Sequence, residues 1–122
     1  MADSLDRLFA SVQDAREREP SVSRTSKLFH DGVHKMAKKL VEEAVEVGLD
    51  AVQMNRDAVV LESADMLYHL AVLWAACGIE PADVMSEIER RERLYGIAEK
   101  LAKQTAPQPV GAIAPHQREA AS

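Results

Sequence analysis

Hydrophobic side chains recur at three- and four-residue spacing along most of this chain, which is the pattern of amphipathic helices. The first predicted helix covers residues 5–18, with Asp3 or Ser4 as its N-cap and Pro20 after its end. The polar stretch 21–32 is rich in serine and threonine and predicts a loop that holds a short helix.

Two long helices are predicted in the middle of the chain. From 33 to about 53 the apolar residues form one stripe, which indicates an amphipathic helix. After a turn, Asp57 is the expected N-cap of a helix over 58–77. This second helix is apolar nearly all round and is therefore expected to be buried on most sides. Gly78 is the expected C-terminal stop.

A last helix is predicted to begin near Pro81 and to break or end at Gly96. No segment shows the alternation of a strand, so the sequence predicts an all-α antiparallel helical bundle. The domain is expected to cover 1–103, followed by a flexible tail over 104–122. Three other helices cover such an apolar central helix poorly, and we expect homodimerisation to complete the bundle.

Composition narrows the class of protein. The chain has 122 residues, 47% of them hydrophobic, as is ordinary for one soluble domain. A net charge of −5 argues against a nucleic-acid-binding protein. The longest apolar run contains Glu62, Asp65 and His69, which argues against a membrane span. The one cysteine and the absence of a signal-like N-terminal pattern predict a cytoplasmic protein.

Two acid pairs stand at i, i+3 spacing on the two long helices: Glu43 with Glu46, and Glu62 with Asp65. Each pair shares a helical face. If the helices form an antiparallel hairpin, all four carboxylates converge near its seam. A hard divalent cation cancels the resulting repulsion, and an all-oxygen shell suits Mg²⁺ or Mn²⁺. Because Mg²⁺ is commonly shared with substrate phosphates, the expected chemistry is phosphoanhydride hydrolysis or transfer.

A structural interpretation stands beside the catalytic one. Lys38 with Glu42 and Lys39 with Glu43 have the i, i+4 spacing of ion pairs on a solvated helix face. The acids of the later helix fit this interpretation less well, because their surroundings are apolar. His69 lies one turn beyond Asp65, and two roles are open to it: it orients an acid of the site, or it is a core histidine satisfied by one hydrogen bond, which is the interpretation we prefer.

With these residues in view, the chain resembles the phosphoribosyl-ATP pyrophosphohydrolases of the all-α, MazG-like NTP pyrophosphatase superfamily. The resemblance covers roughly residues 21–100. It combines an ExxE…ExxD pattern with four more specific segments. These are "SRTSKLF" (23–29), "KKLVEEAVE" (38–46), "ESADMLYHLAVLW" (62–74) and "DVMSEIERR" (83–91).

The resemblance implies Mg²⁺-dependent hydrolysis of the α–β phosphoanhydride of phosphoribosyl-ATP, in histidine biosynthesis, by a homodimer. It implies that the acids of the two pairs hold the metal: Glu43, Glu46, Glu62 and Asp65. One of these acids, or the adjacent Glu42, positions or deprotonates the attacking water, so the catalytic candidates are Glu42, Glu43 and Glu46. The candidate substrate-binding residues are Thr25, Lys27, Lys35, Lys39 and Arg91.

The chain departs from the family pattern at several positions near the expected substrate region, and two of them bear on the substrate. Val41 replaces a usual glycine, and Arg24 stands where an aromatic residue is common. These departures support an alternative substrate, another nucleoside triphosphate cleaved to its monophosphate and pyrophosphate. A third hypothesis is a non-catalytic helical dimerisation module.

Overall fold

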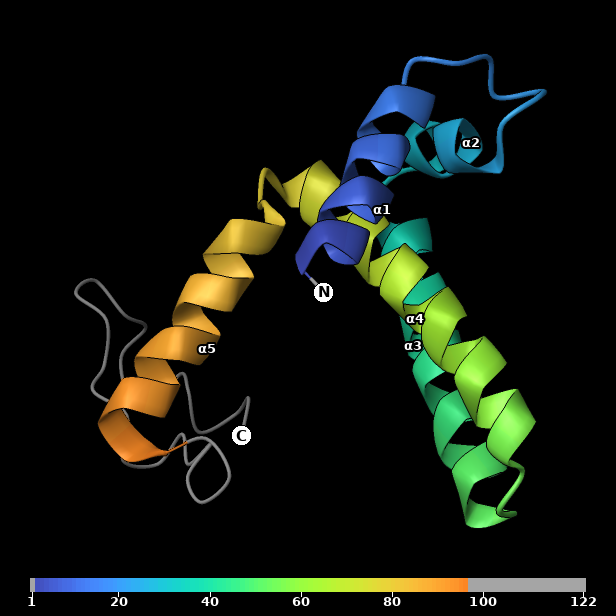
Figure 1. Cartoon of the computed structure of the whole chain (residues 1–122). Coiled ribbons are helices and arrows are strands. Elements are labelled where there is room, and N and C mark those ends of the chain that lie inside the picture. The colour runs from blue at the N-terminus through green and yellow to red at the C-terminus, as the bar shows by residue number, and fades with distance from the viewer. Residues whose placement is uncertain (1, 97–122) are drawn as a thin grey trace, which may run out of the picture. The chain divides into compact units, whose positions relative to one another are not determined.

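The computed structural model describes residues 2–96, and within them the chain forms five helices and no strand (Figure 1). The helices are α1 (Ala2–Ala15), α2 (Arg24–Asp31), α3 (Val33–Val52), α4 (Arg56–Cys77) and α5 (Pro81–Tyr95). The all-α prediction is therefore confirmed. The single domain predicted over 1–103 stays a prediction, and the expected tail over 104–122 lies outside the described residues.

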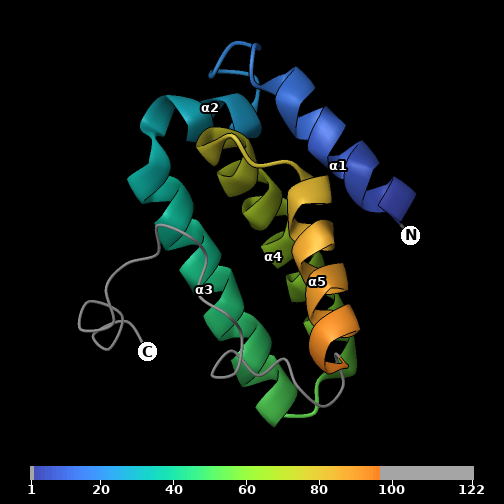
Figure 2. The same ribbon diagram turned by 90° about the vertical axis from the view of Figure 1, so that its left-hand side faces the viewer.

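The chain divides into two compact units after Met85, so that α5 begins in the first unit and continues in the second. In the first unit, α3 and α4 lie side by side as an antiparallel hairpin (Figures 1 and 2). Helix α1 packs against α4, and α2 contacts both members of the hairpin.

Two predicted helix starts were wrong. Helix α1 begins at Ala2, so Asp3 and Ser4 lie within its first turn and neither is its N-cap. Helix α4 is capped by Asn55, whose side chain accepts a hydrogen bond from the Ala58 backbone N–H at 3.3 Å. The expected cap of α4, Asp57, lies inside its first turn, where its charge is still favourable to the helix dipole.

Helix α1 ends at Ala15 and not at residue 18 as predicted, whereas the ends of α3, α4 and α5 agree with the apolar pattern. Gly78 adopts the left-handed conformation (φ 74°) and ends α4, as predicted. The last helix ends at Tyr95, directly before Gly96. Gly32 separates α2 from α3 with φ 100°, a conformation that other residues rarely adopt. The backbone of Gly32 therefore sets the angle between α2 and α3.

The hydrophobic core lies where α1 and α2 cover the C-terminal half of α4 and the start of α3. It contains Phe9, Val12, Leu28, Met36, Ala71, Val72, Trp74 and Ala75. The N-terminal half of α4 is different, because Val60 and Leu61 are exposed there, as is Leu67 just past the middle of the helix. The expectation that α4 is buried on most sides therefore holds only for its C-terminal half in the single chain.

Helix α4 is, by length and composition, the one described helix that could cross a membrane. The core helix of a soluble protein has the same properties. Its C-terminal half packs in the core, and its N-terminal half carries Glu62 and Asp65. We therefore interpret α4 as the central helix of a folded domain.

Met36→Ala is expected to destabilise the fold by about 2–5 kcal/mol, because it empties a core position. The Met36 side chain is only 2% exposed. Met54→Ala is the matched control, since Met54 is 86% exposed and its truncation should cost less than about 0.5 kcal/mol. Urea denaturation of both variants, at one protein concentration, gives the comparison. Equal losses of stability would contradict the assignment of the core.

Candidate functional site

Carboxylates from the two hairpin helices meet at the seam between them. Glu43 of α3 and Glu62 and Asp65 of α4 each offer an oxygen atom, and these atoms lie within 4.8 Å of one another. Glu46 also lies beside Glu62, close enough to perturb its titration. We call these four residues the acid cluster.

The acid cluster carries unrelieved negative charge. Hydrogen bonding of a protonated Glu62 to the Glu43 carboxyl group, and next to that of Glu46, raises the pKa of Glu62 to about 7, and burial and charge repulsion act in the same direction. The Oε1 atom of Glu43 is buried and has no hydrogen-bond partner among the described residues. A buried, unpartnered carboxylate oxygen beside two further carboxylates fits the oxygen-donor set of a hard divalent cation.

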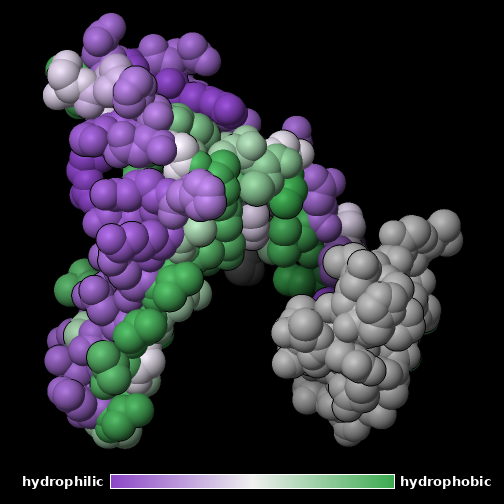
Figure 3. Space-filling model, turned by 180° about the vertical axis from the view of Figure 1, so that it is seen from behind, coloured by the Kyte–Doolittle hydropathy of each residue, from purple (hydrophilic) through white to green (hydrophobic). Residues whose placement is uncertain are grey.

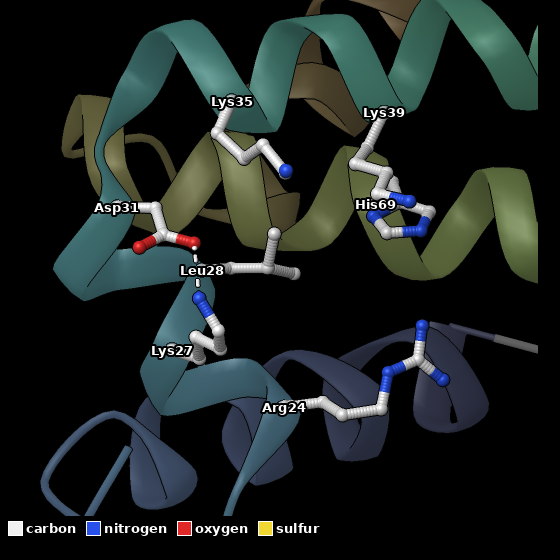
Figure 4. Close-up of a pocket in the computed structure, with 7 residues that line it drawn as sticks. All are labelled: Arg24, Lys27, Leu28, Asp31, Lys35, Lys39 and His69. Atoms are coloured by element: carbon white, nitrogen blue, oxygen red, sulfur yellow. Dashed lines mark hydrogen bonds and ion pairs between the residues drawn. The ribbon is translucent and has the colours of Figure 1, made fainter. Parts of the chain in front are cut away.

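A pocket of about 180 Å³ lies next to the acid cluster, between α2, α3 and α4 (Figure 4). Its lining residues are Arg24, Lys27, Leu28, Asp31, Lys35, Lys39 and His69. We call it the cationic pocket, because four of these side chains are cations and one is an acid. Lys27 donates a hydrogen bond to Asp31 at 3.0 Å, and this contact lowers the pKa of the Asp31 carboxyl.

The cationic pocket includes three of the predicted substrate-binding residues: Lys27, Lys35 and Lys39. Thr25 does not line it. The Thr25 hydroxyl lies 2.5 Å from the hydroxyl of Tyr68 and joins α2 to α4. Arg91 lies in the second unit, where its Nε donates to Glu87 at 2.9 Å.

Glu42, the remaining catalytic candidate, lies on the solvated side of α3. Its Oε1 atom is 4.0 Å from the Nζ atom of Lys39, and 46% of its side chain is exposed. The ion pair between Lys39 and Glu43 that the structural interpretation expects is absent from the described residues. Lys39 therefore points toward the cationic pocket and Glu42, while Glu43 belongs to the acid cluster.

His69 and Arg24 are pocket residues that the sequence did not assign. His69 is 3% exposed, and this burial lowers the pKa of its imidazole, which favours the neutral form. Its Nδ1 atom is buried without a hydrogen-bond partner among the described residues, so the expectation of a satisfied core histidine was wrong on that point. Arg24 was noted only as a departure from a family pattern, and that departure was the available signal.

Comparison with known proteins decides the family. The sequence model of the phosphoribosyl-ATP pyrophosphohydrolase family matches residues 5–92 of this chain. The chain belongs to this family. The matched range contains the whole acid cluster and the whole cationic pocket.

Several relatives of this pyrophosphohydrolase-family chain are similar over most of their length. A "Phosphoribosyl-ATP pyrophosphatase 2" of Rhodopseudomonas palustris is 58% identical over 95% of this chain and 86% of its own length. One of the same name from Bradyrhizobium diazoefficiens is 58% identical over 84% of this chain and 77% of its own. A "Phosphoribosyl-ATP pyrophosphatase" of Azospirillum brasilense is 50% identical over 83% of this chain and 91% of its own.

Proposed function

We propose that this chain hydrolyses phosphoribosyl-ATP to phosphoribosyl-AMP and pyrophosphate, as a cytoplasmic enzyme of histidine biosynthesis. The observation that carries the proposal is the acid cluster, in a chain whose relatives are named for this reaction. The cationic pocket beside the cluster supports an anionic substrate.

Four carboxylates would hold the metal ion: Glu43, Glu46, Glu62 and Asp65. The proposed cofactor is Mg²⁺, with Mn²⁺ as an alternative of similar ligand preference. When bound, the ion polarises the phosphoryl oxygens and offsets the charge that develops on them. The buried oxygen of Glu43 and the raised pKa of Glu62 are the features of this chain that support a cation here.

The attacking water needs a base that solvent can reach. Glu43 has a buried oxygen, and Glu42 faces Lys39, whereas Glu46 is exposed and lies beside Glu62. We assign the water-activating role to Glu46, with Glu43 holding the cation. The lysines of the cationic pocket bind and orient phosphate oxygens.

Pyrophosphate release tests this function directly. The enzyme is assayed on phosphoribosyl-ATP and on a panel of nucleoside triphosphates, each with Mg²⁺ and with a chelator. Release from phosphoribosyl-ATP that depends on Mg²⁺ is the expected result. Activity on the panel alone would replace the substrate. No activity together with no metal binding would favour the non-catalytic dimerisation module.

The α3–α4 hairpin exposes an apolar stripe that supports homodimerisation. On α3 the stripe follows spacings of four and three residues and contains Val41, Val45, Leu49 and Val52, which are between 53% and 81% exposed. Figure 3 shows hydrophobic side chains gathered along one side of this hairpin. An exposed helical stripe of this kind typically packs against another helix, and a second hairpin related by two-fold symmetry supplies one.

Leu49→Glu is expected to convert the proposed dimer to a monomer, because it buries an unpaired charge in the helix seam. Sedimentation equilibrium measures the mass. Val22→Glu is the control, since Val22 is 79% exposed in the loop before α2. A wild-type protein of monomer mass, or a Leu49→Glu variant that stays dimeric, would refute this interface.

A further inference from the structure

His69 lies at the border between the cationic pocket and the acid cluster. It lines the pocket, and it follows Asp65 by about one helical turn on α4. Charged groups of both sites act on its imidazole: Lys39 and Arg24 of the pocket, and Glu43 and Asp65 of the cluster. Figure 4 shows the imidazole beside the Lys39 side chain, with the Arg24 guanidinium extending toward them from α2. A phosphate chain that reaches from the pocket to the cluster therefore passes this side chain.

The two ring nitrogens of His69 have different surroundings. Nδ1 is buried and has no hydrogen-bond partner among residues 2–96. Nε2 forms no hydrogen bond with a described residue either, but it is not buried in this way, so a ligand in the pocket can reach it. Because a buried N–H without an acceptor is rarer in proteins than an acceptor without a donor, we assign the proton of the neutral ring to Nε2. The imidazole thus presents one N–H donor to the pocket.

The aromatic ring of Tyr68 holds the imidazole in place. The centroids of the two rings are 4.9 Å apart, and their planes meet at 68°, which is an edge-to-face contact. The hydroxyl of Tyr68 in turn forms a hydrogen bond with the hydroxyl of Thr25 on α2. Because His69 is also 3% exposed, its ring has little freedom to turn. The Nε2–H donor is therefore oriented before a substrate binds.

The charge of the pocket indicates which part of the substrate lies beside His69. The pocket has four cations and one carboxylate, Asp31, which Lys27 already engages at 3.0 Å. The adjacent β- and γ-phosphates carry the densest negative charge of a nucleoside triphosphate, and they suit such a lining best. With the pyrophosphate end in the pocket and the metal at the acid cluster, the scissile bond lies at the border that His69 occupies.

We infer that His69 is a catalytic residue, whose Nε2–H donates a hydrogen bond to an oxygen of the β-phosphate during hydrolysis. This inference rests on the proposed function, because it takes the acid cluster as the place where the phosphoanhydride is broken. The β-phosphate gains negative charge whether it is attacked or leaves, and a preorganised donor stabilises that charge.

The hydrogen bond requires no proton from His69. The water oxygen joins one phosphorus, and the bond between that phosphorus and the α–β bridging oxygen breaks. The electron pair of the broken bond stays on the bridging oxygen. The proton of the water goes to Glu46, and His69 keeps its own proton throughout.

His69→Leu is expected to lower kcat about 10- to 100-fold with little change in KM, because one hydrogen bond to a charged oxygen is lost in the transition state. His69→Gln should retain most of the turnover, since its amide nitrogen reaches the position of Nε2. His69→Asn is the matched control, because its amide reaches only the position of Nδ1, and it should be as slow as His69→Leu. Thermal unfolding of the three variants shows whether turnover follows stability instead.

Pyrophosphate with Mg²⁺ gives a second readout that does not depend on turnover. It carries the charge that the β-phosphate gains in the reaction, so it should use the same donor. In calorimetry, His69→Leu and His69→Asn should bind pyrophosphate about 10-fold more weakly than wild-type protein. His69→Gln should bind it nearly as well as wild-type protein does.

Three results would overturn the inference. Equal losses in the Gln and Asn variants would trace the effect to packing at this position, and wild-type turnover in His69→Leu would remove His69 from the mechanism. Unchanged pyrophosphate affinity in His69→Leu would exclude the contact with the β-phosphate. Failure of the proposed function is distinct from these. Wild-type protein would then release no pyrophosphate from phosphoribosyl-ATP, while the order of pyrophosphate affinities among the variants would still show whether Nε2–H is a donor.

Discussion

Asp65→Asn is expected to lower kcat for phosphoribosyl-ATP hydrolysis by about 10²- to 10³-fold or more, the loss typical of removing one preorganised electrostatic partner. The substitution keeps the size of the side chain and removes one negative charge from the acid cluster. The fold should be retained or slightly stabilised without Mg²⁺, because repulsion among the remaining carboxylates is smaller. Steady-state pyrophosphate release and thermal unfolding measure the two effects.

Asp57→Asn is the matched control for this variant. It makes the same chemical change on the same helix, at a position whose side chain is 90% exposed and paired with Arg56 at 3.1 Å. Its turnover should stay at the wild-type level. If Asp65→Asn hydrolysed the substrate as fast as this control, the acid cluster would not be the catalytic metal site.

The affinity of the metal-free enzyme for Mg²⁺ is expected to fall about tenfold for each pH unit below 7, and so about 100-fold by pH 5. The pKa of Glu62 is raised to about 7 by Glu43 and Glu46, so a proton occupies the cluster below that pH. The cation must displace this proton before Glu62 can act as a ligand. Calorimetry in buffers of different ionisation enthalpy measures both the affinity and the proton released.

Glu62→Gln separates this linkage from other effects of pH. In that variant Mg²⁺ should bind more weakly at pH 7.5, and the dependence of affinity on pH should become much shallower.

The titration of Glu62 also makes the stability of the metal-free fold depend on pH. Because the pKa of Glu62 is higher in the folded protein than the ordinary 4.5, its contribution to stability is full below pH 4.5 and is lost as the pH rises through 7. Metal-free stability that rose over this range would contradict the assignment.

Helical periodicity predicted the two long helices closely. An apolar stripe that extends over many turns identifies a helix even when the residue at one end of it is misjudged. The start of α4 was less predictable. Asn55 and Asp57 are both good caps, and the choice depends on the turn before them, where Met54 adopts φ 58°. Positive φ at a methionine is uncommon, and no local pattern in the sequence indicates it.

The acid cluster was predictable and the cationic pocket only partly so. The acids lie at fixed spacing on two helices that a short turn forces to run antiparallel, so their meeting follows from helix geometry. The position of Arg24 depends on how α2 crosses α3, which the backbone of Gly32 sets at φ 100°. No periodicity in the sequence encodes that angle. The burial of α4 was overestimated because its apolar surface near Leu61 is exposed in the part of the chain that the structure describes.

The acids all come from α3 and α4, whereas the short helix α2 contributes Arg24 and Lys27 and no member of the acid cluster. These two sets of residues belong to segments joined through one glycine, Gly32. During evolution, replacements in α2 can therefore change the charge and shape of the cationic pocket while the acids of the hairpin stay as they are.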